Sequence, residues 1–195
     1  MKGGSRLWRW FVIFLILLLV IGQLRWLLQR IYPISYGDKI AFYAEKHGLD
    51  PFLVYAVMYI ESRINPEAIS PRGARGLMQI MPDTAQWIAS EIGLTGFDED
   101  MLSIPSINIL MGTWYLASLY REFGSSDVVV LAAYNAGRGN VARWLTDNTW
   151  SGRVTDVDQI PFGETREFVR RVVRVRDWYN YVYRGKWPFS AVGGN

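Results

Sequence analysis

The chain has 195 residues, enough for one domain with a hydrophobic core and a short additional segment. It contains no cysteine, which excludes disulfides, thiolate metal sites and a cysteine nucleophile. Its single histidine, His47, excludes a multi-histidine metal site, and we expect neither a metal nor another cofactor. The available chemistry is therefore that of carboxylates, amides, hydroxyls and backbone groups.

The formal net charge of +3 is unevenly distributed along the chain. Residues 1–35 carry five basic residues and no acidic ones, which leaves 16 basic and 18 acidic residues in the remainder. Charge therefore does not favour nucleic acid as a partner of the chain after residue 35.

An unbroken apolar run, WFVIFLILLLVI, occupies residues 10–21 and follows Lys2, Arg6 and Arg9. A cleaved signal peptide has a similar charge and core, but no small-residue cleavage site follows this run. Flanking tryptophans suit a membrane interface. We therefore predict that residues 1–35 form an uncleaved signal anchor that crosses the cytoplasmic membrane once. The basic N terminus would be cytoplasmic and the rest of the chain extracytoplasmic, on the periplasmic or cell-wall side.

The chain after the predicted anchor has the pattern of helices joined by short loops that contain Gly, Pro and Asn. No segments alternate as the strands of a large sheet would, and no repeat is present. We predict an all-α domain over residues 36–195. The predicted helices cover residues 36–46, 51 to the Asn-Pro pair at 65–66, 82–91, 106 or 108 to 123, 127–136, 140–146 and 164–184.

Glu61 is an acid within an otherwise apolar helix that begins after Asp50-Pro51. A carboxyl group partly buried beside apolar and aromatic side chains has a raised pKa and can deliver a proton near neutral pH. Its position on the helix alone slightly favours the alternative, a surface glutamate on the polar side of an amphipathic helix.

A loop with two glycines, SPRGARGLMQIMP, follows at residues 70–82. Gly73 and Gly76 permit positive φ angles or a close approach of the backbone to a ligand. Ser70 and Gln79 provide a hydroxyl and an amide of the kind that orient a polar, uncharged ligand. Methionines in the same loop provide adaptable apolar surface.

The segment ESRINPEAISPRGARGLMQIMPDTA at residues 61–85 resembles the catalytic region of the soluble lytic transglycosylase family. Later motifs fit the same family, AYNAG at residues 133–137 and IPFGETREFV at residues 160–169. The resemblance covers about residues 38–185. It implies a lysozyme-like helical domain, related to goose-type lysozymes and here preceded by one transmembrane helix.

The resemblance also implies a role for each matched residue. Glu61 is implied as the sole general acid/base, with Ser62 as its structural companion, which we group with the substrate-binding residues. Ser70 would contact the acetamido group of the substrate. The other implied substrate-binding residues are Gln79, Met81, Tyr134, Asn135 and Glu164. Core packing remains an alternative for Tyr134, and a helix N-terminal acid remains one for Glu164.

The implied reaction cleaves the MurNAc-GlcNAc β-1,4 bond of peptidoglycan without water. Glu61 would protonate the glycosidic oxygen, and the N-acetyl group of the substrate would stabilise the oxocarbenium-like centre. The ionised Glu61 would then accept the proton of the C6 hydroxyl, which attacks C1 and forms 1,6-anhydroMurNAc. The implied partners are peptidoglycan strands, the membrane through the N-terminal helix, and cell-wall machinery.

Several alternatives remain open at this point. A hydrolytic muramidase on the same fold would use water in place of the C6 hydroxyl, and a non-catalytic peptidoglycan-binding module would need no acid at Glu61. Glu67 and Asp83 lie near Glu61 in sequence, but solvated positions near helix starts are favoured for both. The segment GRGNVA at residues 137–142 matches a dinucleotide-binding pattern, for which the rest of the chain supplies no βαβ unit. The arginines of the final helix could form a nucleic-acid face, although nearby acidic residues argue against it.

Overall fold

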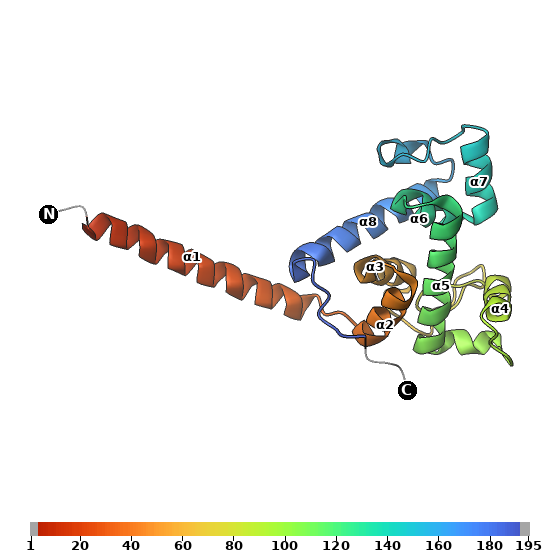
Figure 1. Cartoon of the computed structure of the whole chain (residues 1–195), viewed down its shortest axis with the longest axis horizontal. Coiled ribbons are helices and arrows are strands. Elements are labelled where there is room, and N and C mark those ends of the chain that lie inside the picture. Colours follow the sequence, from red (N-terminus) through yellow and green to blue (C-terminus); the bar gives the residue numbers. More distant parts are fainter. Residues whose placement is uncertain (1–3, 192–195) are drawn as a thin grey trace.

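The computed structural model describes residues 4–191, and for residues 4–7 and Arg25 it describes the backbone alone. Lys2, one of the residues behind the predicted orientation in the membrane, lies outside this range. One long helix, α1 (Gly4–Ile31), extends away from a compact group of shorter helices (Figure 1). The described residues thus form an extended N-terminal element and one helical domain.

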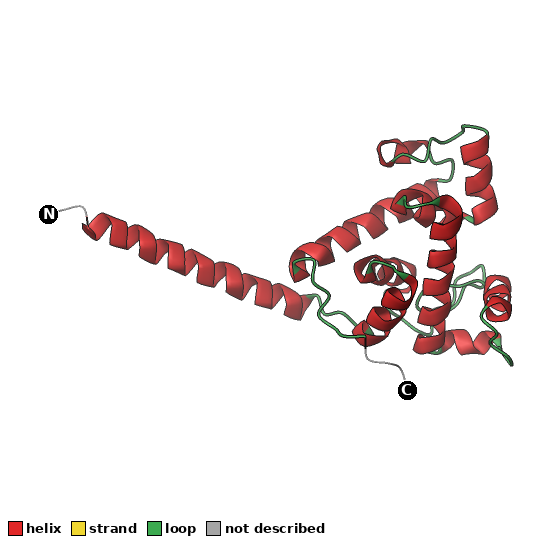
Figure 2. Ribbon diagram, in the orientation of Figure 1, coloured by secondary structure: helices red, strands yellow, loops and turns green. Residues whose placement is uncertain are grey.

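The domain is built from helices and loops, as Figure 2 shows. Among the described residues, β structure is limited to isolated bridges that involve Ile69, Arg75 and Ile80. The prediction of an all-α fold is confirmed. Its elements are α2 (Gly37–His47), α3 (Pro51–Ser62), α4 (Pro82–Glu91), the 3-10 helix η1 (Glu99–Ser103), α5 (Pro105–Phe123), α6 (Asp127–Ala136), α7 (Arg138–Thr146), the 3-10 helix η2 (Val154–Gln159) and α8 (Gly163–Tyr183).

The boundary between α2 and α3 follows directly from local sequence signals. Gly48 ends α2 in the left-handed conformation, with φ at 67°, which glycine adopts without steric cost. Asp50 then caps α3, because its carboxylate accepts a 2.9 Å hydrogen bond from the Phe52 N–H. Pro51 occupies the first helical position, where its missing N–H costs nothing.

The end of α3 differs from the sequence prediction. The helix stops at Ser62, before the Asn-Pro pair at 65–66, because Arg63 and Ile64 adopt left-handed φ angles of 54° and 64°. This conformation is unusual for a β-branched residue such as Ile64, and it is held by packing against the core. Glu61 is therefore in the last turn of the helix, next to the loop that follows.

The hydrophobic core surrounds α3, most of whose residues are buried. Helix α3 packs against α2 and α8, while α6 packs against α5, α7 and α8 (Figure 1). Dense packing of this kind restricts movement of the backbone. Glu61 is thus carried by one of the most firmly held elements of the domain.

The dinucleotide-binding alternative is wrong. It requires a strand before Gly137, but the preceding segment is helix α6. The apolar residues of this segment, Val128 to Ala133, are buried along the helix against the rest of the core.

Helix α1 contains a segment, Trp8–Ile31, that is long and apolar enough to cross a membrane by length and composition. Its 24 residues span about 36 Å as a helix, compared with about 30 Å for the hydrocarbon layer. None of its most apolar window is buried inside the protein. The division into residues 1–35 and 36–195 stays a prediction, and Ile34 is buried against the core of the domain.

Candidate active site

A cavity of about 470 Å³ opens where the end of α3, the glycine-containing loop, the end of α6 and the start of α8 meet. It brings together all of the predicted site residues except Ser62, although they come from segments that are up to about a hundred residues apart in the chain. The residues that line it are Glu61, Ser70, Pro71, Arg72, Ala74, Gln79, Met81, Tyr134, Asn135 and Glu164.

Glu61 is a lining residue whose acidity is strongly altered by its surroundings. Burial raises the pKa of its carboxyl from 4.5 to about 8, and the nearby negative charge of Glu164 adds to this effect. Glu61 therefore holds a proton at neutral pH. It also lies close enough to Tyr134 for its charge to help raise the pKa of that buried phenol well above the ordinary value.

Ser62 lies outside the cavity, which differs from its predicted place among the substrate-binding residues. Its buried hydroxyl is directed to backbone carbonyls, with Leu77 O at 2.8 Å and Met58 O at 3.1 Å. The hydroxyl is thereby committed to joining the end of α3 to the glycine-containing loop. Ser62 supports the acid next to it, and its proton is not available to a ligand.

The glycine-containing loop is held in place by Asn108 of α5, a fully buried residue. Its Oδ1 accepts a 2.7 Å hydrogen bond from the Met78 N–H, and its Nδ2 donates to Arg75 O at 3.0 Å and Leu102 O at 2.8 Å. Sequence reasoning assigned Asn108 no role in the site. Its position in a mostly apolar helix was the available signal, because a buried amide must find partners.

The backbone arrangement at Gly76 leaves no room for a side chain. Its φ is +76°, and a Cβ atom would lie 2.1 Å from Leu102 O and 2.2 Å from Asn108 Nδ2. The glycine thus allows the loop to pack directly on α5 and η1. By contrast, a Cβ atom on Gly73 would meet nothing within 4 Å, although its φ of +87° is also left-handed.

Gln79 and Ser70 present one acceptor and one donor to the cavity. Both N–H groups of Gln79 are used, because Nε2 donates to Ala68 O at 3.0 Å and Gly76 O at 2.9 Å. Its carboxamide oxygen remains as an acceptor. The Ser70 hydroxyl accepts from the Ala74 N–H at 3.0 Å, so its own proton is left to donate. This pair suits an uncharged amide ligand.

Tyr134 and Asn135 are positioned by partners in other elements. The Tyr134 hydroxyl donates to Met78 O at 2.7 Å, which links α6 to the glycine-containing loop. The Oδ1 of Asn135 accepts from the hydroxyl of the buried Thr165 at 2.7 Å. That bond leaves the NH2 group of Asn135 for a ligand, since the lining includes this side chain. Thr165 belongs to the third motif, and sequence reasoning gave it no role.

Glu164 lies in the first turn of α8, where the helix dipole favours a negative charge. It also lines the cavity, so its position is compatible with both sequence interpretations, and its substrate-binding role stays a prediction. Arg72 forms an ion pair with it, with Nη1 3.4 Å from Oε2, and both side chains are exposed. An exposed pair of this kind contributes little stability and separates easily. Arg72 was not among the predicted site residues.

The two other acids considered from the sequence do not line the cavity. Glu67 and Asp83 are both exposed, and Asp83 occupies the first turn of α4. Among the lining residues the carboxylates are those of Glu61 and Glu164.

The sequence matches a known family, described as "Transglycosylase SLT domain", over residues 38–156. The chain is 37% identical over 166 residues to the soluble lytic murein transglycosylase of Escherichia coli K12, which covers 83% of this chain and 25% of that protein. It is 30% identical over 160 residues to the membrane-bound lytic murein transglycosylase C of Actinobacillus pleuropneumoniae, covering 71% of this chain and 44% of the relative.

The fold agrees with the sequence match. The crystal structure of the 70 kDa soluble lytic transglycosylase from Escherichia coli superposes with a TM-score of 0.74 at 36% identity, over 83% of this chain and 26% of that one. The chain thus spans about a quarter of the soluble relative and less than half of the membrane-bound one. The family match covers more than half of the chain and includes the α3 acid and the glycine-containing loop. The chain belongs to the transglycosylase SLT domain family.

Proposed function

We propose that this chain is a peptidoglycan lytic transglycosylase that cleaves the MurNAc-GlcNAc β-1,4 bond and forms 1,6-anhydroMurNAc. The observation that carries the proposal is the buried carboxyl of Glu61, with a pKa of about 8, in a cavity lined by amide-binding groups. Peptidoglycan sugars carry acetamido groups, which match the donor of Ser70 and the acceptor of Gln79. The names of the relatives support the same substrate.

Glu61 acts twice in the proposed reaction. Protonated at neutral pH, it gives its proton to the glycosidic oxygen as the bond to the leaving sugar breaks. The carboxylate that results is poorly solvated, so it readily accepts the proton of the C6 hydroxyl as that oxygen attacks C1. The negative charge of Glu164 helps in both stages, because it favours protonated Glu61 and stabilises a positive oxocarbenium-like centre.

Tyr134 and Asn135 are proposed to position the sugar beside Glu61, and Met81 to provide apolar contact. The exposed side chain of Met81 lines the cavity and can adapt to a sugar face. Ser62 is assigned a supporting role, because its hydroxyl is used within the protein.

A hydrolytic muramidase would use the same acid, with water as the nucleophile, so the product decides between the two reactions. A non-catalytic wall-binding module has no need of a buried acid, whose desolvation is costly to the fold. The raised pKa of Glu61 therefore favours an enzyme.

We also propose that α1 anchors the protein in the cytoplasmic membrane as a single span, with the domain on the extracytoplasmic side where peptidoglycan lies. The apolar segment Trp8–Ile31 and the similarity to a membrane-bound relative support the association with a membrane. The basic residues before the apolar run support the orientation. Cell-wall machinery is a further proposed partner.

The test is digestion of purified peptidoglycan by the full-length chain in detergent micelles, followed by mass spectrometry of the released products. We expect products that end in the anhydro sugar, one water lighter than hydrolysis products. Glu61→Gln should release none, whereas Glu67→Gln, which changes an exposed acid outside the cavity, should act like the wild type. Reducing-end products would identify a hydrolase. No release by the wild-type chain from several peptidoglycan types would favour a binding module.

A further inference from the structure

One face of α8 carries exposed aromatic and basic side chains in a continuous stripe. Arg171, Arg174, Trp178 and Tyr181 are spaced by three, four and three residues, which places them on the same side of the helix. All four are exposed, Trp178 by 38% and Tyr181 by 58%. We call these four residues the α8 stripe. Its aromatic end is the C-terminal end of the helix.

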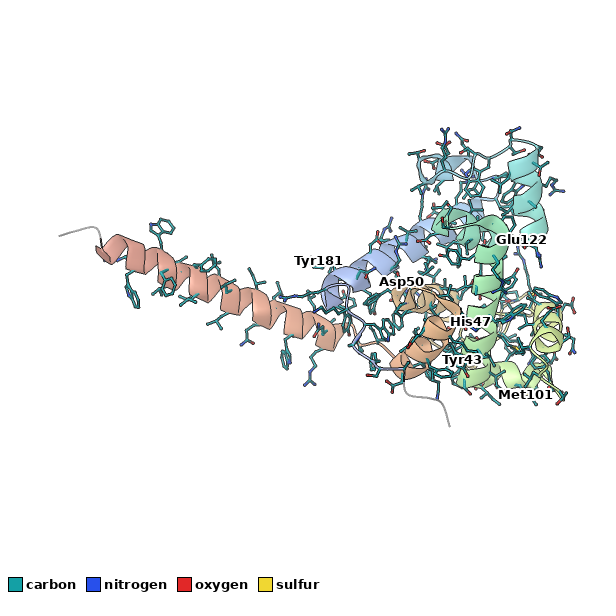
Figure 3. All side chains as sticks on the ribbon, in the orientation of Figure 1. Tyr43, His47, Asp50, Met101, Glu122 and Tyr181 are labelled. Atoms are coloured by element: carbon teal, nitrogen blue, oxygen red, sulfur yellow. The ribbon has the colours of Figure 1, made fainter. Side chains whose placement is uncertain are left out.

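The aromatic end of the α8 stripe adjoins the end of α1. Tyr32, the residue after α1, packs edge-on against Trp178 with ring centroids 5.5 Å apart. Trp178 in turn lies 5.9 Å from Tyr181. Tyr181, labelled in Figure 3, projects from the end of α8 that is nearest to α1. The aromatic end of the α8 stripe thus lies next to the C-terminal end of the candidate membrane span Trp8–Ile31.

The two arginines of the α8 stripe differ from their neighbours on the same helix. Arg170 pairs with Asp158 and Glu167, and Arg176 pairs with Asp127 and Asp177. Within the described part of the chain, Arg171 and Arg174 form no ion pair. Their charges therefore remain available to an anionic partner outside the protein.

The domain is joined to α1 by tertiary contacts. Gln29 Nε2 donates to Val182 O at 3.4 Å, and the Tyr183 hydroxyl donates to Tyr32 O at 2.9 Å. Tyr55 adds a third bond, from its hydroxyl to Pro33 O at 3.2 Å. These bonds place the end of α8 at the level where α1 would leave a bilayer.

We propose that the α8 stripe docks on the headgroup region of the membrane that holds α1, with its aromatic side chains at the interface and its arginines on anionic lipid phosphates. Tyrosine and tryptophan favour this depth, and exposed arginines near it are attracted to anionic lipid. The inference rests on the proposed anchoring of α1. The occupant is a bilayer because the stripe is continuous with the apolar span.

Docking would set the working height of the enzyme. Helix α8 runs away from the end of α1 (Figure 1). Glu164 of the cavity and Tyr181 of the α8 stripe lie near opposite ends of α8. Their separation of 17 residues corresponds to about 26 Å along the helix axis. The cavity would then reach glycan strands within roughly that distance of the membrane surface.

The absence of cysteine allows a direct test by single nitroxide labels. The full-length chain would carry one cysteine, as Leu18→Cys in α1, Tyr181→Cys in the stripe or Val154→Cys on the exposed surface of η2. After reconstitution into vesicles with phosphatidylglycerol, accessibility to oxygen and to a water-soluble nickel chelate reports the depth of each label. We expect Leu18→Cys deep in the bilayer, Tyr181→Cys at the interface and Val154→Cys in water.

A charge reversal then tests the arginines. Added to the Tyr181→Cys protein, Arg174→Glu should lower the ratio of docked to undocked label about fivefold in phosphatidylglycerol vesicles, and much less in phosphatidylcholine vesicles. Arg143→Glu on α7, an equal change of charge away from the stripe, should leave the ratio unchanged. If the Tyr181→Cys label is in water while the Leu18→Cys label of the other protein is deep in the bilayer, the docking is overturned and the anchor stands. A Leu18→Cys label in water would overturn the anchor and the docking together.

Discussion

Replacing Glu61 with glutamine should stabilise the folded protein increasingly as the pH rises. The folded wild-type chain holds the Glu61 proton up to a pH of about 8, whereas the unfolded chain releases it near the ordinary pKa of 4.5. Between these values unfolding releases a proton, so the free energy of unfolding falls by about 1.4 kcal/mol per pH unit. Glutamine keeps the shape of the protonated side chain and does not titrate. The free energy of unfolding of the variant therefore does not fall with pH through this group.

The expected difference in free energy of unfolding between Glu61→Gln and the wild type grows by about 3.5 kcal/mol from pH 5 to pH 8, because the slope of about 1.4 kcal/mol per pH unit flattens near both pKa values. Urea unfolding followed by near-ultraviolet circular dichroism, at each pH unit on the full-length chain in micelles, measures it. Activity provides the second readout, because a reaction that needs protonated Glu61 should decline as the pH rises through about 8.

A matched control separates this effect from a general loss of negative charge. Glu67→Gln makes the same chemical change at an exposed position, and its stability should follow that of the wild type from pH 5 to pH 8. If Glu61→Gln and the wild type also remain parallel over this range, the carboxyl is not desolvated in the folded protein and the proposed acid would have no basis.

Substitutions at four further positions test the structure around the acid. Gly76→Ala should lower the free energy of unfolding, measured with urea, by at least about 3 kcal/mol, since the new methyl group meets a backbone carbonyl at 2.1 Å. Gly73→Ala should lower it by only about 1 kcal/mol, because the new methyl group meets no atom and only the left-handed backbone is unfavourable for alanine. Tyr134→Phe removes the 2.7 Å bond to the glycine-containing loop and should cost about 1–2 kcal/mol in the same assay. Thr165→Val frees the carboxamide of Asn135 and should slow peptidoglycan clearing about tenfold, while Thr165→Ser, which retains the donor, should restore it. Equal rates for these two variants would exclude the positioning role.

Local sequence was sufficient for most of the helix boundaries. A glycine at position 48 and the Asp50-Pro51 pair predicted where α2 ends and α3 begins, because these residues satisfy helix ends through short-range contacts. The end of α3 was predicted too late, since the left-handed turn at Arg63 and Ile64 is held by packing that no local pattern encodes.

The residues of the site were predicted from motifs, but their environment was not. The helix position of Glu61 by itself slightly favours the surface, and only the assembled helices show the burial that raises the pKa of its carboxyl. The family resemblance groups Ser62 with the ligand-binding residues, although its hydroxyl donates to backbone carbonyls within the protein. The supports of the site, Asn108 and Thr165, act across 30 or more residues of sequence.

The sequence by itself determined the all-α class and the apolar N-terminal segment and indicated Glu61 as the candidate acid, because these depend on composition, periodicity and short motifs. Only the tertiary structure decided how these parts act together: the ion pair of Arg72 with Glu164, the fit of Gly76 against α5 and the meeting of α8 with the end of α1. Each of these depends on which faces of distant helices come into contact. The physical reason is that desolvation and close packing are properties of the assembled core and not of any single segment.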